Sequence, residues 1–134
     1  MRYTSIVTSF LKNQEKILLL RRSQNVKTMK GLWGGVSGII ENDETPLKRA
    51  KIEIIEEAGL EENEIKLLKS GIEIDIISPQ YKNHEWHIFP FLFETNSTKI
   101  NLNWENSDFK WINSDEIEKF QTVPSLEKVL LTLI

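Results

Sequence analysis

Two runs of β-branched and apolar residues lie near the start of the sequence, at residues 5–12 and 16–22, with a short polar spacer at 13–15. Such runs are typical of strands, and the spacer predicts that they form a β-hairpin. The polar residues 23–31 predict a loop. The next segment, LWGGVSGII (32–40), has three glycines within five positions, which indicates backbone that closely approaches another group.

The clearest helical pattern covers residues 45–58. Its apolar residues recur at the spacing of one helical face and predict a buried stripe, formed by Leu47, Ala50, Ile54 and Ala58. Pro46 suits the first turn of a helix, and Gly59 suits the position just past the last turn. The side opposite the stripe is predicted to carry three glutamates: Glu53, Glu56 and Glu57.

The second half of the chain predicts a strand, a turn and another strand, at residues 65–77, 78–85 and 86–94. Short strands around a loop at 104–108 follow, and the last predicted elements are helices over 113–120 and 123–134. This order of elements predicts an α+β protein with α/β/α layers, in which a mixed β-sheet lies between helices.

Length and composition exclude several classes of protein. The 134 residues, of which 40% are hydrophobic, fit one compact domain over 1–134, and the net charge of −3 argues against nucleic-acid binding by bulk charge. The chain has no cysteine, which excludes disulfides, thiolate zinc sites and a thiol nucleophile. The longest strongly apolar run, 88–93, is too short to span a bilayer, and the first ten residues do not resemble a secretory signal. We therefore expect a cytoplasmic protein with no membrane partner.

Glu53, Glu56 and Glu57 are spaced so that all three carboxylates share one face of the predicted helix. Like charges this close repel one another, and a hard cation such as Mg²⁺ among them would relieve the repulsion. Mg²⁺ retains water and leaves positions for substrate phosphates, and it lowers the pKa of a bound water. The pattern therefore indicates a site that cleaves phosphoanhydrides. The alternative is a solvated helix surface.

The wider segment GIIENDETPLKRAKIEIIEEAGL (38–60) resembles the Nudix box. In that family's pattern a glycine is followed by five residues and a glutamate, then by seven residues and Arg-Glu-apolar-any-Glu-Glu-any-Gly-apolar. Every fixed position matches except one, at which Ile52 replaces the arginine. The LLLRR segment before the box, a tryptophan in the loop that enters it and the Glu-x5-Trp segment after it are also family-like. The resemblance thus covers most of the chain.

The resemblance implies a Nudix hydrolase that uses Mg²⁺, with Mn²⁺ as an alternative ion, to cleave a diphosphate linkage. The substrate would be a nucleoside diphosphate linked to another moiety, such as a nucleoside triphosphate. The three glutamates and the carbonyl oxygen of Gly38 would hold the metal, and Glu44 would support the site. Glu105 falls where some members keep the general base. Arg22 would contact substrate phosphate, and Trp33 is a candidate for stacking on a base. Each of these three residues has an alternative role. Glu105 would be a charge on a loop, Arg22 a cation at a strand edge paired with a carboxylate, and Trp33 a packing residue.

Ile52 is the main departure from the family pattern, because isoleucine cannot form the ion pair with which the family arginine orients a catalytic glutamate. Arg49 lies one helical turn before Glu53, on the carboxylate face. We hypothesise that Arg49 restores the missing positive charge, with a solvated surface residue as the alternative. A guanidinium beyond hydrogen-bond reach of Glu53 and Glu56 would refute the hypothesis.

Other departures bear on the substrate. Val36 and Ser37 replace part of the family's Pro-Gly-Gly turn, although Gly38 is retained. Residues 120–125 lack the asparagine with which some members read oxidised guanine. The open alternatives are an ADP-ribose or sugar-nucleotide pyrophosphatase, and a non-catalytic nucleotide-binding module in which Ile52 has removed the activity. The family fold also hosts an isomerase of prenyl diphosphates, but that activity would need a cysteine, and this chain has none. Family members often dimerise, so a homodimer is a further alternative.

Overall fold

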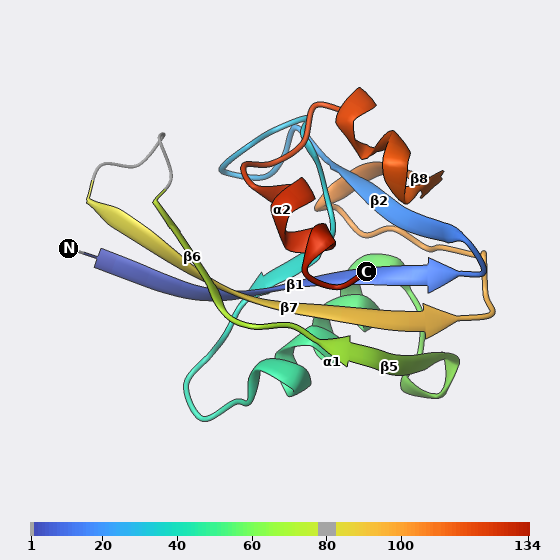
Figure 1. Cartoon of the computed structure of the whole chain (residues 1–134), viewed down its shortest axis with the longest axis horizontal. Coiled ribbons are helices and arrows are strands. Elements are labelled where there is room, and N and C mark those ends of the chain that lie inside the picture. Colours follow the sequence, from blue (N-terminus) through green and yellow to red (C-terminus); the bar gives the residue numbers. More distant parts are fainter. Residues whose placement is uncertain (1, 78–82) are drawn as a thin grey trace.

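The computed structural model describes residues 2–77 and 83–134 (Figure 1). The strands are β1 (Arg2–Asn13), β2 (Lys16–Arg22), β3 (Trp33–Gly34), β4 (Val36–Ile39), β5 (Ile65–Ser70), β6 (Ile74–Ile77), β7 (His84–Thr95) and β8 (Asn106–Asn113). The helices are α1 (Pro46–Ala58) and α2 (Leu126–Leu131), with 3₁₀ helices η1 (Glu62–Glu64) and η2 (Ser114–Lys119). Most of the turn predicted at 78–85 lies outside the described residues.

All eight strands belong to one mixed sheet, whose main order is β3-β2-β1-β7-β5. The two longest strands, β1 and β7, run parallel from the pair Arg2↔His84 to the pair Lys12↔Glu94. The other strands pair antiparallel, with β4 beside β1, β6 beside β7 and β8 beside β2.

Hydrophobic side chains cover both faces of this sheet. On β1, Val7 and Leu11 join one core with Ile54 of α1, whereas Phe10 points to the other face and joins Leu126 of α2. This follows from the alternation of side chains along a strand. Figure 1 shows α1 and α2 on opposite faces of the sheet. The predicted α+β architecture, with a mixed sheet between helices, is therefore confirmed.

The predicted hairpin between β1 and β2 exists only near its turn, where Lys12 pairs with Ile17 and Asn13 with Lys16. Beyond that point the two strands diverge. The middle of β1, residues 6–9, pairs with β4, whereas β2 pairs with β3 and β8. This divergence brings the glycine-rich segment against β1.

The strand predicted over 65–77 is wrong in one respect, because it is broken into β5 and β6 at Gly71. Both pieces pair with β7, and the break lies opposite Pro90. The amide of Gly71 donates to the carbonyl oxygen of Pro90 at 2.8 Å, but proline has no N–H to return a hydrogen bond. The ladder therefore stops at this residue.

The predicted helices differ in how well they match. Thr45 caps α1 by accepting a hydrogen bond from the Lys48 amide at 3.1 Å, and Gly59 ends the helix with a left-handed φ of 71°. The helix predicted over 123–134 is shorter, since Ser125 has a left-handed φ of 67° and α2 begins only after it. Among the described residues, no helix is long and apolar enough to cross a bilayer.

Candidate active site

Glu53 and Glu57 lie on the buried side of α1, which corrects the prediction that they lie opposite its apolar stripe. Their exposed fractions are 7% and 3%, whereas Glu56 is exposed. Residue 57 follows Ala50 by about two helical turns, so both side chains leave the helix on the same side. Two of the three carboxylates are therefore largely removed from solvent.

Gly38 borders the Glu53 carboxyl group. It is held on β4 by its pairing with Val7 of β1, and β4 packs beside α1. A β-carbon added to Gly38 would overlap the carboxyl carbon and Oε2 of Glu53. The glycine is thus required by close approach of the strand to a carboxylate.

Glu105 joins two of the helix carboxylates, although it lies about fifty residues later in the sequence. One oxygen each from Glu53, Glu56 and Glu105 lie within 4.8 Å of one another. Hydrogen bonds of the Glu105 backbone help to fix the loop that carries it: the Glu105 amide donates to Asn103 Oδ1 at 3.1 Å, and the Glu105 carbonyl oxygen accepts from the Ser23 amide at 2.8 Å. The structure therefore brings three of the four predicted catalytic carboxylates together.

Glu57, the fourth, points to a different partner. Its Oε1 accepts a hydrogen bond from Asn106 Nδ2 at 3.1 Å, while its buried Oε2 receives none from the described residues. Burial raises the pKa of Glu57 well above its ordinary value, and the nearby Glu53 and Glu105 carboxylates act in the same direction. Sequence reasoning missed Asn106, whose only signal was its place directly after Glu105.

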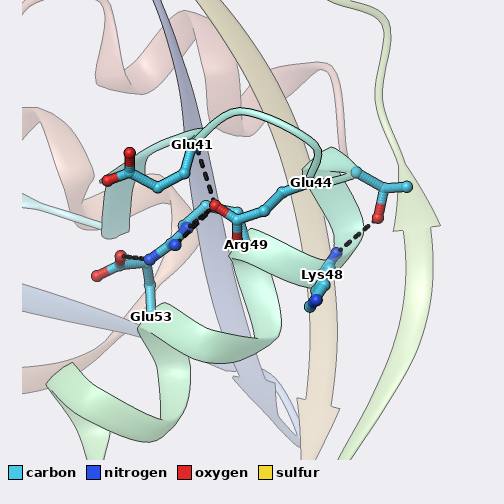
Figure 2. A network of polar contacts seen from close by, with 6 residues as sticks. Glu41, Glu44, Lys48, Arg49 and Glu53 are labelled. Atoms are coloured by element: carbon cyan, nitrogen blue, oxygen red, sulfur yellow. Dashed lines mark hydrogen bonds and ion pairs between the residues drawn. The ribbon is translucent and has the colours of Figure 1, made fainter.

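Arg49 lies between Glu44 and Glu53 (Figure 2). Its Nη1 donates to Glu53 Oε2 at 2.8 Å and its Nη2 to Glu44 Oε1 at 2.7 Å, with a third bond from Nε to the same Glu44 oxygen at 3.2 Å. The guanidinium is therefore within hydrogen-bond reach of Glu53, as the hypothesis requires. The Arg49 hydrogen bond lowers the pKa of Glu44, and at Glu53 it opposes burial, which raises the pKa of that carboxyl.

The three clustered carboxylates and Arg49 line a cavity of about 380 Å³, whereas Glu44 and Glu57 do not line it. Its acidic end is lined by charged side chains: Arg22, Glu41, Arg49, Glu53, Glu56 and Glu105. Its apolar end is lined by hydrophobic side chains of β1, β6, β7 and the C-terminal segment, among them Ile6, Ile76, Trp86, Ile88, Val123, Leu126 and Val129. One cavity therefore joins a carboxylate cluster to a surface suited to a ring.

The two arginines that end β2 point to different places. Arg22 lines the cavity, where its Nε donates to the Thr28 carbonyl oxygen at 3.1 Å. Arg21 is exposed and donates to the Gly31 carbonyl oxygen at 3.1 Å. Successive side chains of a strand point to opposite faces, which accounts for their different directions.

The NUDIX domain model matches residues 2–133 of the sequence. This chain is a member of the Nudix family. One relative, the dihydroneopterin triphosphate diphosphatase of Haemophilus influenzae, is 29% identical over 143 residues, which cover 96% of this chain and 87% of that protein. Family membership and this diphosphatase relative together identify a hydrolase that acts on phosphoanhydride bonds.

Solved structures confirm the Nudix fold. An Ap4A hydrolase from C. elegans superposes with a TM-score of 0.80 at 15% identity, covering 97% of this chain and 94% of that one. A MutT protein from Methanosarcina mazei gives 0.76 at 21% identity, covering 97% and 91%. At these identities the likeness concerns the fold alone.

Nudix hydrolases generally use divalent metals, and the donors of this Nudix chain fit such an ion. The clustered atoms are carboxylate oxygens, which Mg²⁺ and Mn²⁺ prefer. The Oε2 of Glu57, which has no hydrogen-bond partner among the described residues, is a second indication, because a buried carboxylate oxygen is costly without a partner. A separate group, Glu73, Asp75 and His87, also lies within 4.8 Å, but its two carboxylates are exposed, as is common without any ion.

Of the two predicted substrate-binding residues, Trp33 does not line this Nudix cavity within the described part of the chain. Its ring packs edge-on against Phe120, with centroids 5.3 Å apart and an interplanar angle of 70°. Trp86 lines the cavity instead and was missed, because on a predicted strand it resembles any packing residue. Its position two residues before Ile88, on the same face of β7, was the available signal.

Proposed function

We propose that this Nudix hydrolase cleaves the triphosphate chain of a compound that carries a planar heterocycle, as in a nucleoside triphosphate. The products would be a monophosphate and pyrophosphate. The observation that carries the proposal is the single cavity in which three carboxylates, with oxygens within 4.8 Å, face the same space as an apolar, tryptophan-containing end. The relative named for dihydroneopterin triphosphate supports a heterocyclic triphosphate.

Glu53, Glu56 and Glu57, with the Gly38 carbonyl oxygen, are proposed to hold Mg²⁺. When bound, Mg²⁺ neutralises phosphate charge and lowers the pKa of a water molecule. The chain's own contribution is to fix the carboxylates before substrate arrives, because Gly38 borders Glu53 on one side and Asn106 donates to Glu57. Preorganised charge is worth more than charge that must rearrange.

Glu105 is proposed as the general base. Water attacks a phosphorus atom, its proton passes to the Glu105 carboxylate, and the phosphoanhydride bond breaks so that the leaving phosphate takes the bonding electron pair. A base must lie within reach of that water, and Glu105 reaches the cavity beside Glu53 and Glu56 while Asn103 holds its backbone. Arg22, which also lines the cavity, would contact a phosphate oxygen, since a guanidinium suits that geometry.

The apolar end is proposed to receive the heterocycle. Trp86 stacks on His84 with ring centroids 4.6 Å apart and an interplanar angle of 20°, so its ring is held in one orientation. Ile76, which pairs with Trp86 from β6, and Ile88, two residues further along β7, lie beside it on the same face. A flat, rigid platform between aliphatic side chains favours stacking of a planar ring.

The test is product release from a panel of compounds with Mg²⁺ and with Mn²⁺, followed by ³¹P NMR. The panel contains nucleoside triphosphates, dihydroneopterin triphosphate, ADP-ribose, dinucleoside polyphosphates and sugar nucleotides. We expect pyrophosphate and a monophosphate from one or more triphosphates, and no turnover by Glu56→Gln. Turnover of ADP-ribose or sugar nucleotides alone would contradict the proposal, as would turnover of none of the panel.

A further inference from the structure

The Glu53 carboxylate is confined from two sides. On one side is the backbone of Gly38, which leaves no room for a β-carbon. On the other is Arg49, whose Nη1 donates to Oε2 at 2.8 Å. Glu53 also contributes a carboxylate oxygen to the cluster with Glu56 and Glu105, within 4.8 Å of theirs. The side chain is thus held in one orientation beside the other two carboxylates.

Arg49 is itself held by Glu44. Two of its nitrogens donate to Glu44 Oε1, which also accepts from the Glu41 amide at 2.9 Å. The exposed side-chain fractions of Arg49 and Glu44 are 14% and 11%, so this pair is largely out of solvent. Figure 2 shows a continuous connection from the loop backbone at Glu41 through Glu44 and Arg49 to Glu53.

A guanidinium suits this position better than an ammonium would. It is planar, stays charged and offers donors in a fixed fork, so it can bond to two carboxylates at once. The two carboxylates lie on either side of it, one from the loop before α1 and one from the helix. Lysine at the same position would carry the charge but would not span both.

We infer that Arg49 is the positioning residue that orients Glu53, and that it takes over, from one helical turn earlier, the task of the box arginine that Ile52 replaces. Partners that hydrogen-bond metal-ligating carboxylates set their orientation, and losing such a partner typically reduces metal affinity or activity about 10–100-fold. The inference rests on the proposed function, because Glu53 must be a metal ligand for its orientation to matter.

The experiment compares four variants of the full chain with the parent: Arg49→Met, Arg49→Lys, the transposed double variant Arg49→Met/Ile52→Arg, and Lys48→Met. The last is the matched control, because it removes the same charge from the neighbouring, exposed position of α1. For each variant kcat and KM are measured on the best triphosphate, and Mn²⁺ affinity is measured by the EPR signal of the free ion. Circular dichroism shows which variants fold.

We expect Arg49→Met to lower kcat and Mn²⁺ affinity by about tenfold or more, with KM changed by less than about threefold. Arg49→Lys should recover little, the transposed variant should regain part of kcat, and Lys48→Met should match the parent. The Mn²⁺ affinity of Arg49→Met distinguishes a positioning role from a simple charge effect. Losing a nearby positive charge would by itself tighten cation binding, whereas losing the orientation of Glu53 should weaken it. If Arg49→Met does not fold, the lysine and transposed variants decide.

Several outcomes would overturn the inference. They are an unchanged kcat in folded Arg49→Met, tighter Mn²⁺ binding in that variant, full recovery by lysine, or a transposed variant that folds and stays as slow as Arg49→Met. Failure of the proposed function looks different: the parent would bind Mn²⁺ without turning over any triphosphate. The Mn²⁺ affinities of the variants would then still test the role of Arg49.

Discussion

At the acidic end of the cavity Glu53 and Glu105 are each fixed by a polar partner, whereas the apolar end is lined by side chains that also belong to the hydrophobic core. Ile88, Leu126 and Val129 face the cavity and at the same time pack in the core on the α2 side of the sheet. The acidic end therefore depends on a few directional bonds, and the apolar end on shape. Substitutions at the first should change the rate of chemistry, and substitutions at the second should change substrate binding.

The largest effect is expected from Glu56→Gln. Glu56 is exposed at the cavity, so its replacement leaves the core intact while it removes the charge of a proposed metal ligand. Metal-held charge stabilisation is worth several kcal/mol, so kcat should fall by roughly 10³-fold. Glu127→Gln, on the exposed side of α2, is the matched control. Retained kcat in Glu56→Gln would contradict the assignment of the acidic end to chemistry.

Glu105→Gln should follow, with a loss of roughly 10²-fold in kcat, the contribution typical of a general base. Mn²⁺ affinity should stay within about threefold of the parent, since the proposed ligands remain. If Mn²⁺ affinity falls together with kcat, Glu105 is a ligand and not the base.

Gly38→Ala tests the acidic end without removing any charge. The added methyl group would overlap the Glu53 carboxyl group, so that carboxylate must move. We expect kcat to fall about 10–100-fold while KM changes little. Unfolding by urea should show whether the chain remains folded. Normal kcat in this variant would mean that the orientation of Glu53 is unimportant.

Trp86→Leu tests the apolar end. Loss of stacking on a ring typically costs about 1–3 kcal/mol, so KM should rise about tenfold while kcat stays within about threefold. Trp33→Leu is the matched control, because its ring packs on Phe120 away from the cavity. A larger change in KM for the Trp33 variant would restore Trp33 as the stacking residue.

The smallest effect concerns stability in the absence of metal. The pKa of Glu57 is raised above its ordinary value of 4.5, so the folded chain binds its proton more tightly than the unfolded chain does. That stabilising contribution is complete below 4.5 and is lost as the pH rises through the pKa of the folded chain. The Tm of the chain in EDTA should therefore fall as the pH rises above 4.5, and Glu57→Gln should weaken this dependence. If the Tm of Glu57→Gln depends on pH as the Tm of the parent does, Glu57 is not the group that causes this dependence.

The sequence predicted the acidic end better than the apolar end, for a physical reason. Gly38, Glu53 and Arg49 lie within one strand, turn and helix, so fixed spacing places them without knowledge of the rest of the fold. Asn106 can donate to Glu57 only when β8 lies near α1 in the folded chain, and no local sequence pattern predicts that contact. Trp86 and Ile88 read as core residues, because a cavity lined by core side chains leaves no separate signature.

The fold shows the same division. The strands, the sheet between helices and the caps of α1 followed from local residue patterns. The break at Gly71 and the early divergence of β1 from β2 did not, since both depend on which strand lies alongside. The burial of Glu57 could have been predicted locally, because Glu57 follows Ala50 by about two helical turns. The prediction that it lies opposite the apolar stripe was wrong for that reason.

The break between β5 and β6 opposite Pro90 affects how two copies of this chain could associate in solution. β5 and β6 form an outer edge of the described sheet, and a continuous strand there would offer its backbone to a neighbouring molecule. The proline limits the pieces to six and four residues, a bulge between Leu67 and Lys69 twists the first, and Lys66 and Lys69 are exposed on it. Short strands, bulges and lysines each discourage edge-to-edge pairing. The residue that breaks the ladder thus also makes this edge a poor template for pairing with another molecule.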